Sequence, residues 1–188
     1  MSDHPRSREL RMGRYSQQGQ IYMVTSTLRG RNPVFSDWRI GRLLVAQFRE
    51  AQELGFAHSL AWVVMPDHFH WMFELQGTSI EKLVQRVKSK SGIAVNKARG
   101  ETGSIWQDGY HDVAVRREED VVRFARYIVA NPLRAGLVRS LGDYSLWDAI
   151  WLQPSGPLDD VENKSRASSL PPKACLRIPK PWEGACSR

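Results

Sequence analysis

Cysteines in the body of the chain, long apolar runs and an excess of acidic residues are all missing, and each absence excludes a class of protein. The two cysteines of the 188 residues, Cys175 and Cys186, lie close to the C-terminus, so no disulfide framework can hold a fold together. No apolar run reaches the ~18 residues of a transmembrane helix, and the N-terminus is charged where a secretory signal is apolar. We therefore expect a cytoplasmic protein without a membrane partner.

Acidic side chains are outnumbered, because 27 Lys and Arg face 20 Asp and Glu and give a net charge of +7. Such a charge suits a polyanionic partner. The length suits one domain with its own core, which we place at 20–153. We expect a basic flexible arm at 1–19 and a Pro- and Ser-rich basic tail at 154–188, disordered because it buries too little apolar surface to offset the entropy of ordering.

Apolar patterning predicts the order β-α-β-β-α-β, which is typical of an α+β, ferredoxin-like fold. Ser36 is predicted to cap the first helix and Gly55 to end it. Pro66-Asp67 is too short for a parallel crossover, so the strands on either side should form an antiparallel hairpin. We expect an antiparallel sheet with helices on one face, plus an additional C-terminal helix that carries Tyr127. The expected strands are 21–28, 58–65, 68–75 and 104–115, the last with a kink at Asp108-Gly109. The other helices follow Ser36, span 80–98 and begin at 118.

Two histidines, His68 and His70, lie within one predicted strand. Because strand side chains alternate between faces, both imidazoles should project from the same face. Two neighbouring neutral imidazoles form half of a metal site. The alternative is a pair of half-buried strand histidines that bind no ligand.

Tyr127 and Asn131 are four residues apart on a predicted helix and should face the same way. Pro132 disfavours α geometry at Asn131, so this residue is expected at a junction. There its amide oxygen is suited to metal ligation, or its side chain to capping a helix at 132–138. The alternative for Tyr127 is a half-buried packing residue.

Six basic residues crowd the predicted helix at 80–98 and its end, against the single acid Glu81: Lys82, Arg86, Lys88, Lys90, Lys97 and Arg99. A surface of mixed sign would serve solubility as well as this one-sided surface does. The helix is therefore a candidate nucleic-acid face, and the alternative is a solvated helix surface.

Two motifs together resemble a known family. His68-Phe69-His70 after Val-Met-Pro-Asp, with Tyr127 in Arg-Tyr-Ile-Val-Ala-Asn-Pro-Leu-Arg-Ala-Gly-Leu-Val, resembles the single-tyrosine HUH transposases, in which U is a hydrophobic residue. The chain is similar in particular to the REP-associated tyrosine transposases, the branch linked to repetitive extragenic palindromes. The resemblance runs from about Arg14 to about Trp151 and includes 106–112 and 116–120. Neither short motif is specific alone, but both within a β-α-β-β-α-β order form a joint signal.

The resemblance implies endonuclease and strand-transfer chemistry on single-stranded DNA beside a hairpin, through a 5′-phosphotyrosine on Tyr127. It makes His68 and His70 ligands of a divalent metal, Mg²⁺ or Mn²⁺, with Asn131 as the third ligand, and it implies no nucleotide cofactor. A phenol is a weak nucleophile at neutral pH, and a metal that polarises the phosphate supplies the missing activation. The REP-associated branch suggests a monomer, whereas insertion-sequence relatives are dimers. The residues expected at the DNA are Arg11, Arg14, Lys82, Arg86, Lys88, Lys90, Arg116 and Arg117.

Two other functions stay open at the level of the sequence. Ferredoxin-like sheets also serve as non-catalytic RNA- or single-stranded-DNA-binding modules, in which exposed strand aromatics stack on bases. The candidate aromatics are Trp62, Trp71, Phe73 and Trp106, although aromatic residues in strands usually belong to the core. A metal phosphoesterase that activates water is the other alternative, and it would not need Tyr127.

Overall fold

The structure is a computed structural model that describes residues 16–150. The predicted tail, both cysteines, Arg11 and Arg14 lie outside the described residues, as does the predicted arm up to residue 15. Within 16–150, none of the helices has the length and apolar character needed to cross a membrane.

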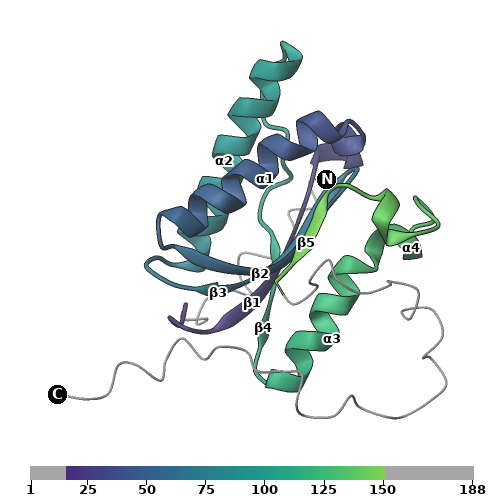
Figure 1. The fold of residues 1–188 in the computed structure, drawn as a ribbon. Coiled ribbons are helices and arrows are strands. Elements are labelled where there is room, and N and C mark those ends of the chain that lie inside the picture. The colour runs from purple at the N-terminus through teal and green to yellow at the C-terminus, as the bar shows by residue number, and fades with distance from the viewer. Residues whose placement is uncertain (1–15, 151–188) are drawn as a thin grey trace, which may run out of the picture. The chain divides into compact units, whose positions relative to one another are not determined.

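The described residues form five strands and four α-helices in the predicted β-α-β-β-α-β order, followed by the tyrosine helix (Figure 1). The strands are β1 (Ile21–Thr27), β2 (Ala57–Met65), β3 (His68–Leu75), β4 (His111–Val115) and β5 (Trp147–Ala149). The α-helices are α1 (Trp38–Glu53), α2 (Ile80–Arg99), α3 (Glu118–Val129) and α4 (Asn131–Arg134). Short 3-10 helices occur at η2 (Arg29–Arg31), η3 (Val34–Ser36) and η4 (Leu141–Asp143).

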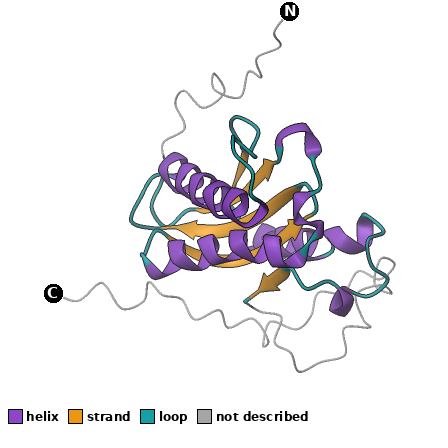
Figure 2. Cartoon of the chain, turned by 90° about the horizontal axis from the view of Figure 1, so that it is seen from above, coloured by secondary structure: helices purple, strands orange, loops and turns teal. Residues whose placement is uncertain are grey.

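All strand pairs of the sheet are antiparallel, in the order β4-β1-β3-β2-β5. The strands gather into one sheet with helices packed against it (Figure 2). The first four strands have the ferredoxin-like arrangement that the pattern predicts, with β2 and β3 joined as a tight hairpin through Pro66-Asp67. The chain after α4 returns to the sheet as β5, and the Tyr144 hydroxyl donates a hydrogen bond to the Val64 carbonyl at 2.7 Å. The predicted α+β class is confirmed.

The sheet is covered on both faces (Figure 1). The larger hydrophobic cluster joins α1 and α2 to one face, with Phe48 and Val84 against Trp71 of β3. The second cluster joins α3 to the other face, with Ala125 and Ile128 among the side chains around Met72 of β3. Helices α1 and α2 therefore share one face, as expected, and the additional tyrosine helix occupies the opposite one.

The start of α1 differs from the prediction by one residue. Its N-cap is Asp37, whose side chain accepts a hydrogen bond from the Arg39 amide at 2.9 Å. The predicted cap, Ser36, instead ends the 3-10 helix η3, because the chain first makes this extra turn after Pro33. Gly55 follows the helix with a positive φ of 66°, as predicted for a residue that ends a helix.

The predicted strand at 104–115 is wrong as one continuous strand. Only His111–Val115 pairs regularly with β1, while Trp106 makes a single bridge to Leu28 and the Gln107 amide donates to the Thr27 carbonyl at 2.9 Å. The predicted kink at Asp108-Gly109 lies between these parts, where Gly109 has a positive φ of 72°. The Lys88 ammonium of α2 donates hydrogen bonds to the carbonyls of Gln107 and Gly109, at 2.7 and 2.5 Å, so these carbonyls point to α2.

Residues 16–19 contact the sheet and the start of α2. The Ser16 hydroxyl accepts a hydrogen bond from the Ile80 amide at 3.1 Å, and the Gly19 amide donates to the Leu75 carbonyl at 2.8 Å. The Gln18 side-chain amide donates to the Thr78 carbonyl at 3.0 Å. One backbone bond and two side-chain bonds thus hold this segment beside β3 and α2.

The centre of the larger core gives a stability prediction. Phe48 is 1% exposed and stacks on Trp71 at a ring distance of 4.6 Å. We expect Phe48→Ala to lower the free energy of unfolding by about 3–5 kcal/mol, because the substitution leaves a cavity between α1 and the sheet. Urea denaturation of the full chain measures the change. Ile93→Ala on α2 is the control, since Ile93 is 70% exposed and its loss should cost no more than about 0.5 kcal/mol.

Candidate active site

His68 and His70 project from the face of β3 that carries α3. Strand alternation puts Phe69 and Trp71 into the core under α1 and α2, and turns His68, His70 and Met72 the other way. The two imidazole rings lie 4.9 Å apart, nearly perpendicular at 82°. His70 is 7% exposed, so the pair sits at the edge of the second hydrophobic cluster.

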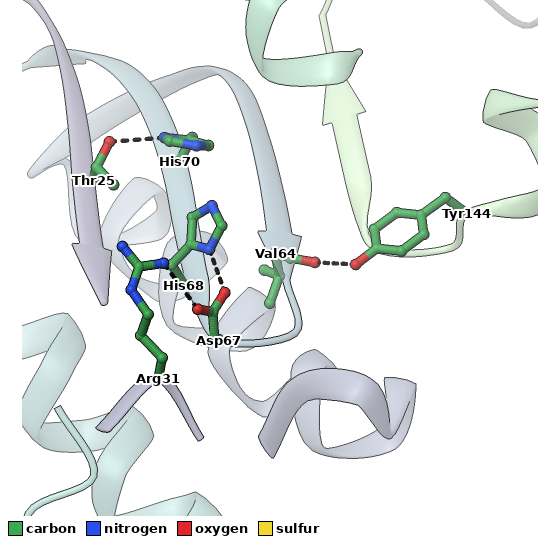
Figure 3. Close-up of polar contacts among 7 residues, drawn as sticks. All are labelled: Thr25, Arg31, Val64, Asp67, His68, His70 and Tyr144. Carbon is green, nitrogen blue, oxygen red and sulfur yellow. Dashed lines mark hydrogen bonds and ion pairs between the residues drawn. The ribbon is translucent and has the colours of Figure 1, made fainter. Parts of the chain in front are cut away.

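Each imidazole is oriented through its Nδ1 atom (Figure 3). Thr25 of β1 is opposite His70 in the register, and its hydroxyl lies 2.7 Å from His70 Nδ1. His68 Nδ1 lies 2.5 Å from a carboxylate oxygen of Asp67, which also pairs with Arg31 at 3.2 Å. Because both Nδ1 atoms are engaged, the Nε2 atoms are the ones that the two rings offer to a ligand.

The charge state of His70 follows from its position. Burial, together with the neighbouring His68, lowers the pKa of His70 from 6.5 to about 4. The ring is therefore neutral at physiological pH, as a metal ligand must be. Burial alone would raise the pKa of Asp67, but hydrogen bonds from His68 and Arg31 outweigh it and leave that pKa lowered. The carboxylate stays ionised behind His68.

Tyr127 reaches this pair from α3. The helix buries Val121, Ala125 and Ile128 against the sheet, and Tyr127 lies beside this buried edge with 39% of its surface exposed. The Tyr127 ring lies 5.8 Å from the His70 ring, at an angle of 68°. The Tyr127 ring is thus partly exposed to solvent and lies next to the His70 imidazole.

Asn131 lies one turn beyond Tyr127, at the start of α4. Its Nδ2 donates hydrogen bonds to the carbonyls of Tyr127 and Ile128, at 2.7 and 3.3 Å. The expected cap at the start of a following helix is wrong, because α4 has Ala130 as its N-cap residue and no side-chain cap. Pro132 has no N–H to give to the Ile128 carbonyl four residues earlier, and the Asn131 amide takes that place. These bonds use the amide nitrogen and leave Oδ1 as the atom suited to a cation.

The donor set suits a partly open metal site. Within residues 16–150, no group of three or more His, Cys, Asp or Glu is placed to hold a metal. Two neutral imidazoles with oriented Nδ1 atoms are present, together with one amide one turn from Tyr127. Such a set leaves coordination positions for phosphate and water, unlike a closed four-ligand zinc site.

The predicted DNA-binding residues fall into separate places. Those on α2 lie on the opposite side of the sheet from α3, and several have intramolecular partners. Arg86 pairs with Glu50 of α1 at 2.8 Å, Lys90 pairs with the same carboxylate, and Lys88 binds the backbone near Gly109. Hydrogen bonds from Lys90 and Arg86 lower the pKa of Glu50, so this carboxylate stays charged between the helices.

Arg116 and Arg117 lie between β4 and α3, on the chain that leads to Tyr127. Arg117 pairs with Glu119 at 3.7 Å, and both side chains are largely exposed. Lys82 is on the first turn of α2 and exposed. The structure therefore brings the imidazoles and Tyr127 together and leaves the α2 bases outside that group.

The strand aromatics do not form a stacking platform. Trp71 and Phe73 are fully buried, and Trp106 is 4% exposed with its indole N–H bound to Ser91. Trp62 is half-buried against the larger cluster. Bases cannot stack on these rings without opening the core, which removes the feature that favoured a non-catalytic binding module.

Three residues near the site were not identified from the sequence: Thr25, Asp67 and Arg134. The sequence pattern assigns Asp67 to a turn. Its position directly before His68 could also have indicated a carboxylate behind a ligating imidazole. Thr25 depends on the register of β1 against β3, which no local pattern reports. The Arg134 guanidinium lies 4.8 Å above the Tyr127 ring, and its spacing of seven residues from Tyr127 was the available signal.

Comparison with known proteins agrees with this architecture. A family model described as "Transposase IS200 like" matches residues 16–131. The REP-associated tyrosine transposase of Escherichia coli (strain K12) is 25% identical over 133 residues, which are 70% of this chain and 77% of that protein. A solved structure of a REP-associated tyrosine transposase bound to a REP hairpin shares the fold, with a TM-score of 0.60 at 23% identity. The match covers 78% of this chain and 82% of that one.

The matched family model spans more than half of the chain and contains His68, His70, Tyr127 and Asn131. The predicted resemblance to the REP-associated tyrosine transposases is confirmed by the curated relative and by the shared fold. The chain belongs to the IS200-like transposase family, whose members process DNA.

Proposed function

We propose that the protein is a metal-dependent endonuclease and strand transferase for single-stranded DNA, acting beside a hairpin through a 5′-phosphotyrosine intermediate. The observation that carries the proposal is the position of the Tyr127 ring, 5.8 Å from the ring of a buried, neutral His70. Membership of the IS200-like transposases supports the reaction class.

Tyr127 is the proposed nucleophile. Its phenol oxygen forms a bond to phosphorus while the bond from phosphorus to the 3′ oxygen breaks, and the departing 3′ oxygen takes up a proton as the phenol loses one. The ester bond is kept as phosphotyrosine, so a 3′ hydroxyl can reverse the step and join two strands. The partial exposure of Tyr127 gives DNA access to the oxygen, while the buried edge of α3 fixes the helix.

His68 and His70 would hold Mg²⁺ or Mn²⁺ through Nε2, with Asn131 Oδ1 as the third ligand. Bound there, the ion would polarise the scissile phosphate and neutralise charge that develops on it. Thr25 and Asp67 fix the ring orientations of His70 and His68. Burial keeps His70 free of a competing proton.

Hairpin DNA is the proposed partner, by analogy with the relative whose structure contains a REP hairpin. The proposed contacts to its backbone come from Arg116 and Arg117, from the α2 bases, and from Arg11 and Arg14. The proposed organisation is a catalytic domain at about 20–153, extended at its N-terminal end by 16–19, with a basic arm before it and a tail at 154–188. We propose a monomer, because His68, His70 and Tyr127 of one chain already adjoin one another.

Replacing the Tyr127 hydroxyl tests the mechanism directly. Tyr127→Phe removes one oxygen from a side chain whose helix is held by other residues, so the fold and hairpin binding should persist while the covalent adduct disappears. Adduct formation on a single-stranded hairpin oligonucleotide with Mg²⁺ or Mn²⁺ is followed by denaturing gel electrophoresis. Tyr22→Phe is the matched control, since Tyr22 is buried in the other cluster. Nicking by Tyr127→Phe at the wild-type rate would show that water is the nucleophile.

The residues behind the imidazoles should control metal affinity. We expect His68→Ala or His70→Ala to abolish cleavage while hairpin binding falls less than about 3-fold, because basic residues supply most of the DNA affinity. Thr25→Val and Asp67→Asn keep both imidazoles and should weaken Mn²⁺ binding by about 10- to 100-fold. Isothermal titration of the full chain with Mn²⁺ measures the affinity. Unchanged Mn²⁺ affinity in both His→Ala variants would place the metal elsewhere.

The burial of His70 predicts a pH dependence of stability. Between pH 6.5 and about 4 the unfolded chain binds a proton at this side chain and the folded chain does not, so stability falls as the pH falls through this window. Relative to His70→Gln, the wild type should lose about 2 kcal/mol more of its unfolding free energy between pH 7 and pH 5. Urea denaturation in the presence of a chelator measures this loss.

Equal pH dependence in the wild type and His70→Gln would mean that the His70 ring is protonated in the folded protein at pH 5.

A further inference from the structure

Arg134 lies beside the proposed nucleophile, Tyr127. Its guanidinium carbon lies 4.8 Å from the centre of the Tyr127 ring, over the face of the ring. The sequence separation of seven residues carries Arg134 two turns along, onto the same side as Tyr127. Arg134 is exposed, so solvent and ligands reach it from outside.

The backbone of Arg134 is fixed relative to α3. Its amide donates a hydrogen bond to the Ala130 carbonyl at 3.0 Å, and the Leu137 amide donates to the Pro132 carbonyl at 2.9 Å. Pro132 itself is buried. The short helix α4 is therefore a rigid extension of the tyrosine helix, and the Arg134 side chain starts from a defined position next to Tyr127.

The guanidinium of Arg134 differs from those of Arg117 and Arg123 in its partners. Arg123, one turn before Tyr127, pairs with Asp120 at 2.9 Å, and Arg117 pairs with Glu119. Within residues 16–150, no carboxylate pairs with Arg134, and its guanidinium lies over the Tyr127 ring. Its N–H groups are thus available to an anion beside Tyr127.

We propose that Arg134 is a positioning residue, which holds the Tyr127 ring by stacking and binds a non-bridging oxygen of the phosphate that Tyr127 attacks. The inference rests on the proposed function and adds a residue to it. A planar guanidinium can stack on an aromatic face and at the same time donate two parallel hydrogen bonds to a phosphate.

The test measures the initial rate of adduct formation between the full chain and a single-stranded hairpin oligonucleotide, with Mn²⁺, as a function of oligonucleotide concentration. We expect Arg134→Met to lower the maximal rate by about 10- to 100-fold, because the attacked phosphate loses the hydrogen bonds of the guanidinium. The oligonucleotide concentration at half the maximal rate should change by less than about 3-fold. Arg134→Lys keeps the charge without the planar fork, so it should restore only part of the maximal rate.

Arg126→Met is the matched control, because Arg126 is an exposed arginine of α3 whose loss removes the same charge. It should keep the maximal rate and the oligonucleotide concentration at half the maximal rate within about 3-fold of the wild type, since general attraction to DNA is shared among many bases. Hairpin affinity of each variant, measured in the Tyr127→Phe background, should also stay within about 3-fold. Thermal melting checks that all variants are folded.

Two outcomes overturn the inference in distinguishable ways. Equal maximal rates for Arg134→Met and Arg126→Met, beside a wild type that forms the adduct, would remove the role of Arg134 alone. A wild type that forms no Tyr127-dependent adduct under any of these conditions would overturn the proposed function, and the role of Arg134 with it.

Discussion

The two-residue alternation of β3 is the constraint on which the rest of the structure depends. One set of its side chains, including Phe69 and Trp71, is buried under α1 and α2. The other set, His68 and His70, faces α3. A shift of one residue in the register would bury two imidazoles in an aromatic core and expose the aromatic rings. Such a shift would strongly destabilise the fold. The same apolar contacts that stabilise the domain therefore aim the imidazoles at the tyrosine helix.

The polar groups around the imidazoles extend this constraint from geometry to chemistry. Burial that fixes the His70 ring also keeps it unprotonated, and Thr25 on the neighbouring strand sets its orientation. Asp67, in the hairpin turn, contacts His68 Nδ1 and also pairs with Arg31. The position and orientation of both rings, and the neutral state of His70, thus follow from the pairing of three adjacent strands.

Local patterns were sufficient for the element order, the hairpin and the shared facing of His68 with His70, because each depends on neighbours in the sequence. The errors have non-local and local causes. The segment before β4 departs from regular pairing where Lys88 of the distant helix α2 binds its carbonyls. The other two causes are local: the Asn131 side-chain amide bonds to the Ile128 carbonyl, for which Pro132 has no donor, and an additional 3-10 turn makes Asp37 the cap instead of Ser36. The positions of Thr25 and Arg134 beside the site depend on strand register and helix packing, which no local pattern reports.

The central position of β3 determines how firmly each part of the site is held. Both edges of β3 are hydrogen-bonded, to β1 and to β2, so its backbone amides are released only when the sheet itself opens. Helix α3 is attached by one apolar stripe and shares no backbone hydrogen bonds with the sheet, so it belongs to a separate, less costly unit of local opening. The backbone amides of β3 are therefore expected to exchange with solvent more slowly than those of α3. The sheet itself holds the two imidazoles, whereas the position of Tyr127 depends on the packing of one helix.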